Sequence, residues 1–388
     1  MSRAPRPALL RVVGPLLGAA LWVLWKGPAL LHGRAHFGVL REGQGGQVAT
    51  GLTLDAEQAN PAVLGALEGT PVTFFLPAEA SLLAPALLAS GHELGLLARS
   101  SRTLAADRAR LEALSGVPVT LARFRRYHPL TLPRARAAGV RPVWPGPTGM
   151  PEALLNLAEP GGLLDLGGLN ANQITGLLTE LRTRGYTPGP IGKLQGLRAE
   201  TPRGLLQRLY RRFIDARFDR QHGSVALTQR PRGLFRISYR PYEGPPLTRP
   251  DGSQYPSGTP AAELHIYSKR LVALAELSAL TGLRGVQISL HDVAKALQER
   301  AEFADVQLIY ALTIFGGVLG AMGFQTEPLP NRRQARVMAV FFNLLRVLYE
   351  AKNTDSQVLL PAVIWMSRET LLARYGQGAR PARATAPR

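Results

Sequence analysis

Cysteine is absent from this chain of 388 residues. Its absence excludes disulfide bonds, catalysis by a thiolate and zinc sites with cysteine ligands. Lysine is also scarce, because only five of the 46 basic residues are lysines. The sequence contains neither a P-loop nor a Gly-x-Gly-x-x-Gly motif, so the common glycine-rich phosphate-binding loops are excluded as well.

Acidic residues are much less frequent than basic ones. The chain has 27 of them against 46 basic residues, which gives a net charge of +19 and an isoelectric point near 11.1. A charge of this size favours anionic partners such as phospholipid head groups, acidic polymers or nucleic acid. The alternative is that the arginines are spread over a solvated surface. Charge alone therefore identifies no partner.

An apolar stretch near the N-terminus spans residues 9–31 and follows Arg3 and Arg6. Its charges, Arg11 and Lys26, lie near its ends, and no small-x-small cleavage site follows it cleanly. A stretch of this length can cross a bilayer, and basic residues before it hold the N-terminus in the cytoplasm. We expect residues 1–35 to be an uncleaved signal-anchor or transmembrane segment at the cell membrane, with the bulk of the protein outside. A cleaved signal peptide with secretion, or a buried helix, is the alternative.

Residues 71–104 have the clearest local pattern. Residues 72–76 form an apolar run that is typical of a buried strand, and residues 82–89 have helical spacing of Leu and Ala. Gly91 then ends the helix, and residues 93–97 form a second apolar run. This order of strand, helix and strand predicts a parallel sheet in the first half of the chain.

The run PVTFFLPAEASLLAPALLASGHELG, residues 71–95, resembles the polysaccharide deacetylase (NodB-homology) family. In that family a strand ending in TFF leads through a helix to a GHE(I/L)G strand. The segment ARAAG at residues 135–139 and the strand-like residues 140–144 continue the resemblance, which spans residues 36–200. It implies an irregular (β/α) barrel.

The resemblance also implies a chemistry, the hydrolysis of carbon–nitrogen bonds in acetylated carbohydrate with zinc or a similar metal. The family's base aspartate is matched by Asp55, whereas its three metal ligands are matched by Ala56, Leu97 and Ser101. A zinc site needs about three protein ligands with nitrogen, oxygen or sulfur donors. We therefore expect no metal and no cofactor, and Asp55 would be vestigial.

Two further site residues follow from the resemblance. The family's FRPP(Y/W)G segment is matched by residues 124–128, so Arg125 takes the position that orients the base aspartate. His128 is expected at the barrel mouth as a ligand contact. The position of the family's acid histidine is matched by Gly167.

The second half of the chain has a different character. Residues 205–218 and 336–351 have the spacing of amphipathic helices, and residues 233–242 alternate as a strand does. Ser289 and Asp292 indicate a capping box that opens a helix over residues 289–300. The uncharged residues 306–324 predict a central buried helix, with a membrane helix as the alternative, and residues 359–375 predict another helix.

The segment AELHIYSKRL, residues 262–271, holds the best candidate site of the second half. If it is a strand, Glu263 and His265 share one face. A Glu/His pair facing a cleft can bind a ligand or transfer protons, with Ser268 close by. The alternative is a buried hydrogen-bonded pair. This half resembles the YkoP-like module that follows deacetylase-like domains in bacteria.

The expected fold class is α/β: a deacetylase-like irregular (β/α) barrel in residues 36–200, followed by a mainly helical (α+β) domain in residues 201–375 and a disordered tail in residues 376–388. The expected function is that of a pseudoenzyme of the cell envelope, a non-catalytic scaffold that binds a glycan or a lipid. An active deacetylase acting on envelope polysaccharide is one alternative. A basic module that binds anionic lipid or nucleic acid is the other, although we do not expect nucleic acid as a partner.

Overall fold

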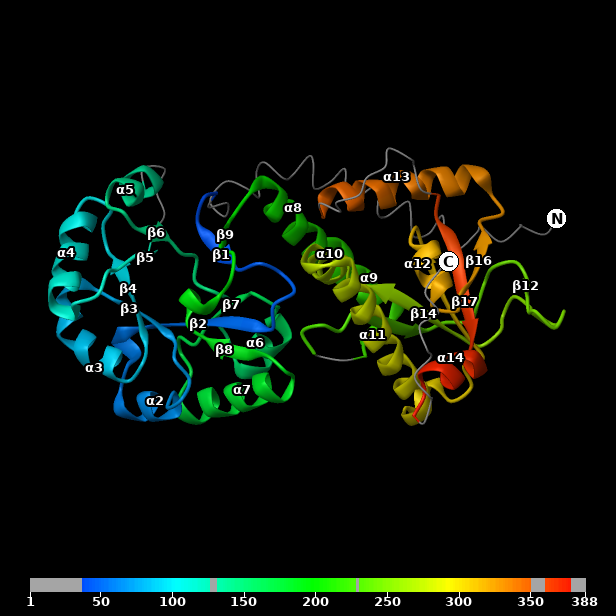
Figure 1. Ribbon diagram of the computed structural model, residues 1–388, viewed down its shortest axis with the longest axis horizontal. Coiled ribbons are helices and arrows are strands. Elements are labelled where there is room, and N and C mark those ends of the chain that lie inside the picture. Colours follow the sequence, from blue (N-terminus) through cyan, green and yellow to red (C-terminus); the bar gives the residue numbers. More distant parts are fainter. Residues whose placement is uncertain (1–36, 126–130, 228–229, 350–359, 378–388) are drawn as a thin grey trace. The chain divides into compact units, whose positions relative to one another are not determined.

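A computed structural model of the protein describes residues 37–125, 131–227, 230–349 and 360–377 (Figure 1). The chain divides into two compact units. Among the described residues, those from 37 to 205 together with Arg230–Arg232 form the first domain, and those from 206 to 227 and from 233 to 377 form the second domain.

The first domain is built on a curled sheet in which every strand pairs in parallel with its neighbours. The strand order is β6-β5-β4-β3-β2-β7, and β8 also pairs with β2. These strands are β2 (Ala49–Asp55), β3 (Thr73–Leu76), β4 (Glu93–Ala98), β5 (Leu121–Phe124), β6 (Arg141–Pro142), β7 (Leu163–Asp165) and β8 (Thr187–Gly189). The short strands β1 (Leu40–Glu42) and β9 (Arg198–Ala199) form a separate antiparallel pair.

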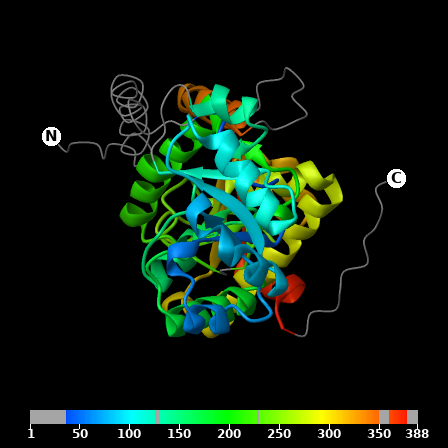
Figure 2. The same cartoon turned by 90° about the vertical axis from the view of Figure 1, so that its left-hand side faces the viewer.

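Helices cover the outside of this sheet (Figures 1 and 2). They are α2 (Pro61–Ala66), α3 (Ala84–Ala89), α4 (Leu104–Ser115), α5 (Thr131–Ala137), α6 (Pro151–Leu157) and α7 (Ala171–Thr183), with short 3₁₀ turns at Ala56–Gln58, Ala78–Leu83 and Ile191–Lys193. The predicted strand, helix and strand of residues 71–104 are β3, α3 and β4. Gly91 has φ +80° where the chain turns from α3 toward β4, a conformation that glycine adopts without strain. The predicted α/β class and deacetylase-like barrel are confirmed.

The second domain is built on a six-stranded mixed sheet of order β10-β11-β14-β15-β17-β16. Within it only β14 and β15 pair in parallel. The strands are β10 (Val225–Ala226), β11 (Phe235–Tyr239), β14 (Ala261–Ile266), β15 (Leu308–Thr313), β16 (Gln325–Pro328) and β17 (Ala362–Ser367), and β12 (Leu247–Thr248) and β13 (Gln254–Tyr255) form a hairpin beside them.

Eight helical segments in the described residues belong to or lead into this domain. They are α8 (Pro202–Tyr210), a π-helical turn (Arg211–Asp215), α9 (Ala216–His222), α10 (Ser268–Leu277), α11 (Ala279–Glu299), α12 (Gly316–Ala321), α13 (Arg332–Leu348) and α14 (Arg368–Tyr375), with a 3₁₀ turn at Ala301–Phe303. One face of the sheet packs against α11. The core there includes Ile237 and Leu264 from the sheet with Leu290 and Val293 from the helix. The other face carries the pocket described below.

Two predicted helices of this domain are wrong. Residues 306–324 form β15, a turn and the short α12, so they are neither a central helix nor a membrane helix. Residues 359–375 contain β17 followed by α14. Strands β15 and β17 are mostly buried, and buried strands are apolar runs whose composition helical and extended structures share.

The predicted location at the cell membrane is corrected as well. Among the described residues no helix is both long and apolar enough to cross a bilayer. Residues 9–31, to which the anchor was assigned, lie outside the described residues. As far as the chain is described, a single-pass anchor has no support, and that prediction is wrong.

The predicted capping box at Ser289 is also wrong, because α11 begins ten residues earlier. Ser278 is its N-cap, and the Ser278 side chain accepts a hydrogen bond from the backbone N–H of Thr281. Ser289 is buried in the middle of the helix. Its hydroxyl donates to the carbonyl of Gly285 and accepts from the N–H of Leu234, each at 2.9 Å. Ser289 thus joins α11 to the segment that leads into β11.

Replacing Ser289 should therefore destabilise the second domain. The substitution Ser289→Ala leaves the buried N–H of Leu234 without its acceptor, which costs about 1–3 kcal/mol of unfolding free energy. Ser278→Ala removes the N-cap and should cost about 1 kcal/mol. Urea denaturation measures both, with Ser257→Ala at an exposed turn as the control, expected within about 0.5 kcal/mol of wild type. A neutral Ser289→Ala would contradict this role.

Candidate functional site

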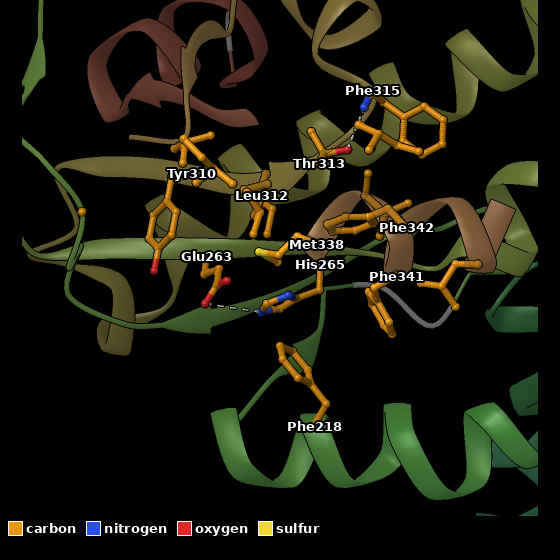
Figure 3. A pocket seen from close by; sticks show the side chains of 18 of the residues that line it. Phe218, Glu263, His265, Tyr310, Leu312, Thr313, Phe315, Met338, Phe341 and Phe342 are labelled. Atoms are coloured by element: carbon orange, nitrogen blue, oxygen red, sulfur yellow. Dashed lines mark hydrogen bonds and ion pairs between the residues drawn. The ribbon is translucent and has the colours of Figure 1, made fainter. Parts of the chain in front are cut away.

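A pocket of about 920 Å³ lies on the face of the second domain's sheet that is opposite to α11. Its floor is formed by side chains of β11, β14 and β15, and its walls come from α9 and α13 (Figure 3). The volume is at the upper end of the range of small-molecule sites. Most of the lining is apolar, including Phe218, Leu312, Phe315, Met338, Phe341 and Phe342.

Strand alternation determines which side chains reach this pocket. In β14 the side chains of Glu263 and His265 face the pocket, and Leu264 between them belongs to the core on the other face. Glu263 pairs in register with Ser238 of β11 and with Tyr310 of β15. The structure therefore brings Glu263 and His265 together on one face. Ser268, the third residue singled out in this segment, is the first residue of α10.

Glu263 is a mostly buried carboxyl group with an incomplete set of partners. Its side chain is 17% exposed, and its Oε2 lies 3.9 Å from both Arg240 Nη1 and His265 Nε2, which is beyond hydrogen-bond distance. Within the described chain this buried oxygen has no hydrogen-bond partner. Burial raises the pKa of Glu263 to about 7, although the charge of Arg240 and hydrogen bonding with Tyr310 oppose the rise. The site thus holds a carboxyl group that takes up a proton near neutral pH.

His265 is held as a neutral imidazole. Its Nε2 lies 3.2 Å from the hydroxyl oxygen of Ser238, and its ring meets that of Phe218 edge to face at 4.9 Å between centroids. Burial lowers the pKa of His265 to about 3, and the charge of Arg236 acts in the same direction. Glu263 and His265 are therefore not an ion pair at neutral pH, because His265 carries no charge there.

A second charged cluster lies at the α9 side of the pocket. Arg236 of β11 forms an ion pair with Asp219, and its guanidinium carbon lies 4.5 Å from the centroid of the Tyr267 ring. Asp215, four residues before Asp219, also lines the pocket, and burial raises its pKa to about 6. Sequence reasoning missed this cluster. Its one sequence signal was the spacing of Asp215 and Asp219, which places them on one helix face.

In the first domain, the aspartate of the resembled family's base position lies at the carboxyl end of β2. Asp55 Oδ1 accepts a hydrogen bond from Arg123 Nη1 at 2.9 Å, and Arg123 Nη2 lies 2.8 Å from Asp165 Oδ2. The side chain of Asp165 is 2% exposed, and its Oδ1 also accepts a hydrogen bond from the backbone N–H of Gly167. Arg123 therefore joins the ends of β2 and β7 through two carboxylates.

The arginine that forms an ion pair with Asp55 is Arg123, two positions before the expected Arg125. Arg125 forms its ion pair with Glu57 at 2.6 Å, on the surface, so it does not orient Asp55. Side chains alternate along the β5 segment, and Arg123 and Arg125 can take the same face, but only Arg123 belongs to the strand itself. His128 lies outside the described residues.

The residues beside Asp55 do not fit a divalent metal. Ala56 and Leu97 are buried and have no donor atom in their side chains, and the hydroxyl of Ser101 accepts a hydrogen bond from Arg134. In the part of the chain that the structure describes, no group of three His, Cys, Asp or Glu side chains is placed to hold a metal ion. The charge of Asp55 is instead met by the guanidinium of Arg123.

Arg123 should be more important for stability than Arg125. The substitution Arg123→Gln leaves Asp165 buried without its charged partner and should lower the unfolding free energy by about 3 kcal/mol. Arg125→Gln is the matched control, because Arg125 and Glu57 are 51% and 49% exposed, and it should cost less than about 1 kcal/mol. Denaturant unfolding of both variants tests this, and equal losses would refute the assignment.

The pKa of Glu263 predicts a pH dependence of stability. Because it is raised from its ordinary value of 4.5 to about 7, the folded protein binds this proton more tightly than the unfolded chain does. The contribution is complete below pH 4.5 and is lost as the pH rises to about 7, with an upper bound of about 3 kcal/mol. Relative to Glu263→Gln, wild type should therefore lose stability between these pH values. Glu302→Gln, at an exposed position that does not line the pocket, should follow wild type; a Glu263→Gln variant that also does so would contradict the prediction.

Comparison with known proteins finds a matching family model and similar solved structures for this chain. Residues 204–375 match the family model of the YkoP domain. Solved structures similar to this chain include a CE4 family pseudoenzyme from Bacillus anthracis (20% identity, TM-score 0.35, covering 40% of this chain and 67% of that one). Another is PdaA of Bacillus subtilis, a family 4 carbohydrate esterase (17%, 0.36, 40% and 84%). A third is a peptidoglycan N-acetylglucosamine deacetylase (16%, 0.37, 42% and 96%).

No curated protein matches the sequence. Similarity with identities and TM-scores as low as these says nothing about the activity of this chain. Both resemblances stated from the sequence are found again by the comparisons: to deacetylases of carbohydrate esterase family 4, pseudoenzymes included, and, over residues 204–375, to the YkoP domain.

Proposed function

We propose that this protein is a pseudoenzyme whose second domain binds a long-chain amphiphile in the pocket between the sheet and α13. The observation that carries the proposal is the pocket itself, about 920 Å³ with apolar walls and a polar floor at Glu263 and His265. A ligand with a hydrocarbon chain and a small polar head matches this division of surface.

The energetics favour a ligand with a long chain. Burial of apolar surface contributes about 25 cal/mol per Å², or about 0.8 kcal/mol for each methylene group. Protein interiors are otherwise packed as densely as organic crystals, so an apolar space of this size on a folded domain suits an apolar occupant. Aromatic side chains from α9 and α13, such as Phe218 and Phe341, supply much of the wall.

The first domain supports the non-catalytic part of the proposal. Hydrolysis of an acetylated amine requires a polarised carbonyl group, an activated water and a proton for the leaving amine. The carboxylate best placed for such work, Asp55, is engaged by Arg123, and the neighbouring positions Ala56 and Leu97 offer no ligand atoms. The alternative is an active deacetylase of envelope polysaccharide, and release of acetate from an acetylated glycan by the purified protein would contradict our proposal.

Filling the pocket should abolish amphiphile binding. Met338 is buried on α13 and points into the pocket (Figure 3), so Met338→Trp occupies the space that the hydrocarbon chain requires. Titration of the full chain with the apolar fluorophore N-phenyl-1-naphthylamine, followed by displacement with hexadecan-1-ol, measures the effect. We expect wild type to bind both compounds and Met338→Trp to lose at least 10-fold in affinity for each.

The matched control is Val347→Trp. Val347 lies on the same helix, is 57% exposed and does not line the pocket, so its replacement should leave both affinities within about 2-fold of wild type. Circular dichroism confirms that each variant is folded. Failure of wild type to bind the fluorophore or any long-chain compound would refute the proposed function.

A further inference from the structure

In the described part of the chain, the polar floor of the pocket includes an unsatisfied hydrogen-bond acceptor. Glu263 Oε2 is buried, carries no hydrogen bond within the described chain, and faces the pocket (Figure 3). Buried polar atoms in folded proteins nearly always have a partner, so an unpaired one that faces a pocket marks a place where a ligand can supply it. The partner must donate a hydrogen bond to a carboxylate, or exchange one with a carboxylic acid.

The charges around this oxygen discriminate between possible heads of the ligand. A cationic head would meet Arg240, whose Nη1 is 3.9 Å from Glu263 Oε2, and Arg236, which also lines the pocket. An anionic head would meet Glu263 itself and Glu243, which lies 3.5 Å from Arg240 and so already faces that guanidinium. Each charged head thus meets groups of like charge as well as groups of opposite charge in a place that is shielded from water.

An uncharged head avoids both conflicts. A hydroxyl group or an amide N–H can donate to Glu263 Oε2, and a hydroxyl can also accept from the carboxyl group when it is protonated. The hydroxyl of Tyr310 and the neutral imidazole of His265 border the same position and add no net charge (Figure 3). The surroundings therefore suit a neutral hydrogen-bond donor at the end of an apolar chain.

We propose that the pocket selects amphiphiles with an uncharged, hydrogen-bond-donating head, such as long-chain alcohols and amides, and that Glu263 Oε2 is the acceptor that recognises this head. The inference rests on the proposed function and deepens it, because it names the class of ligand. The apolar wall provides affinity for the hydrocarbon chain of the ligand, whereas Glu263 provides selectivity for its head group.

Ligands of one chain length test this choice. The methyl ether of hexadecan-1-ol carries a methyl group in place of the hydroxyl hydrogen and so lacks the donor, and hexadecylamine and palmitate carry the charged heads. Each is titrated against the full chain by displacement of N-phenyl-1-naphthylamine. We expect the alcohol to bind about 10-fold tighter than the ether, which corresponds to about 1.4 kcal/mol for satisfying the buried oxygen, and tighter than either charged compound. Equal binding of alcohol and ether, or preference for a charged head, would overturn the inference.

Variants at position 263 assign the preference to one residue. Glu263→Leu should bind alcohol and ether within about 2-fold of each other, because the acceptor is gone. Glu263→Gln keeps an acceptor oxygen and should retain most of the preference. Glu302→Leu, at an exposed position that does not line the pocket, is the control and should behave as wild type. A preference for the alcohol that survives in Glu263→Leu would also refute the role of Glu263.

The outcomes separate the two proposals. If the wild type binds the fluorophore and all long-chain compounds with equal affinity, the pocket binds amphiphiles and only the choice of head is refuted. If it binds none of them, both proposals fail together. The comparison of alcohol with ether in wild type needs no variant, so it tests the inference even if Glu263→Leu does not fold.

Discussion

The parallel pairing of β14 with β15 is the constraint on which the second domain depends. It places Glu263 beside Tyr310 and fixes which face of each strand looks toward α11 and which toward the pocket. A slip of one residue in this register would exchange the two faces and bury Glu263 and His265 in the apolar core. The apolar side chains Leu264 and Ile309, packed on the α11 side, therefore hold the polar floor in position.

Asp165 of the first domain and Glu263 of the second differ in how their burial is compensated. Asp165 is nearly inaccessible, but it is paired with Arg123 and accepts a backbone N–H, so its burial is compensated. Glu263 is somewhat more exposed, yet one of its oxygens has no hydrogen-bond partner in the described chain. A compensated carboxylate is a structural element that joins two strands. An uncompensated one at the floor of a pocket is the stronger indication of a ligand site.

The sequence predicted the elements with local signals and missed those that depend on distant ones. The spacing in residues 71–104 was sufficient for β3, α3 and β4, and alternation was sufficient to put Glu263 and His265 on one face. It was not sufficient for residues 306–324, because an uncharged apolar run has the same composition in a buried strand and a buried helix. The partners of the site come from α9, β11, β15 and α13, segments that are distant in the sequence and that only the fold of the domain brings together. The family alignment points to Arg125, whereas the ion pair of Asp55 in the structure is with Arg123, two positions earlier in the chain.

The position of β17 in the sheet has a consequence for biosynthesis. It lies between β15 and β16, although it follows both of them in the chain and ends at Ser367. A nascent second domain must therefore leave a gap between β15 and the edge strand β16 until β17 has been synthesised. During that interval the edges of β15 and β16 present unpaired backbone groups, which makes this stage the one at which a chaperone would be most useful and a premature stop most damaging.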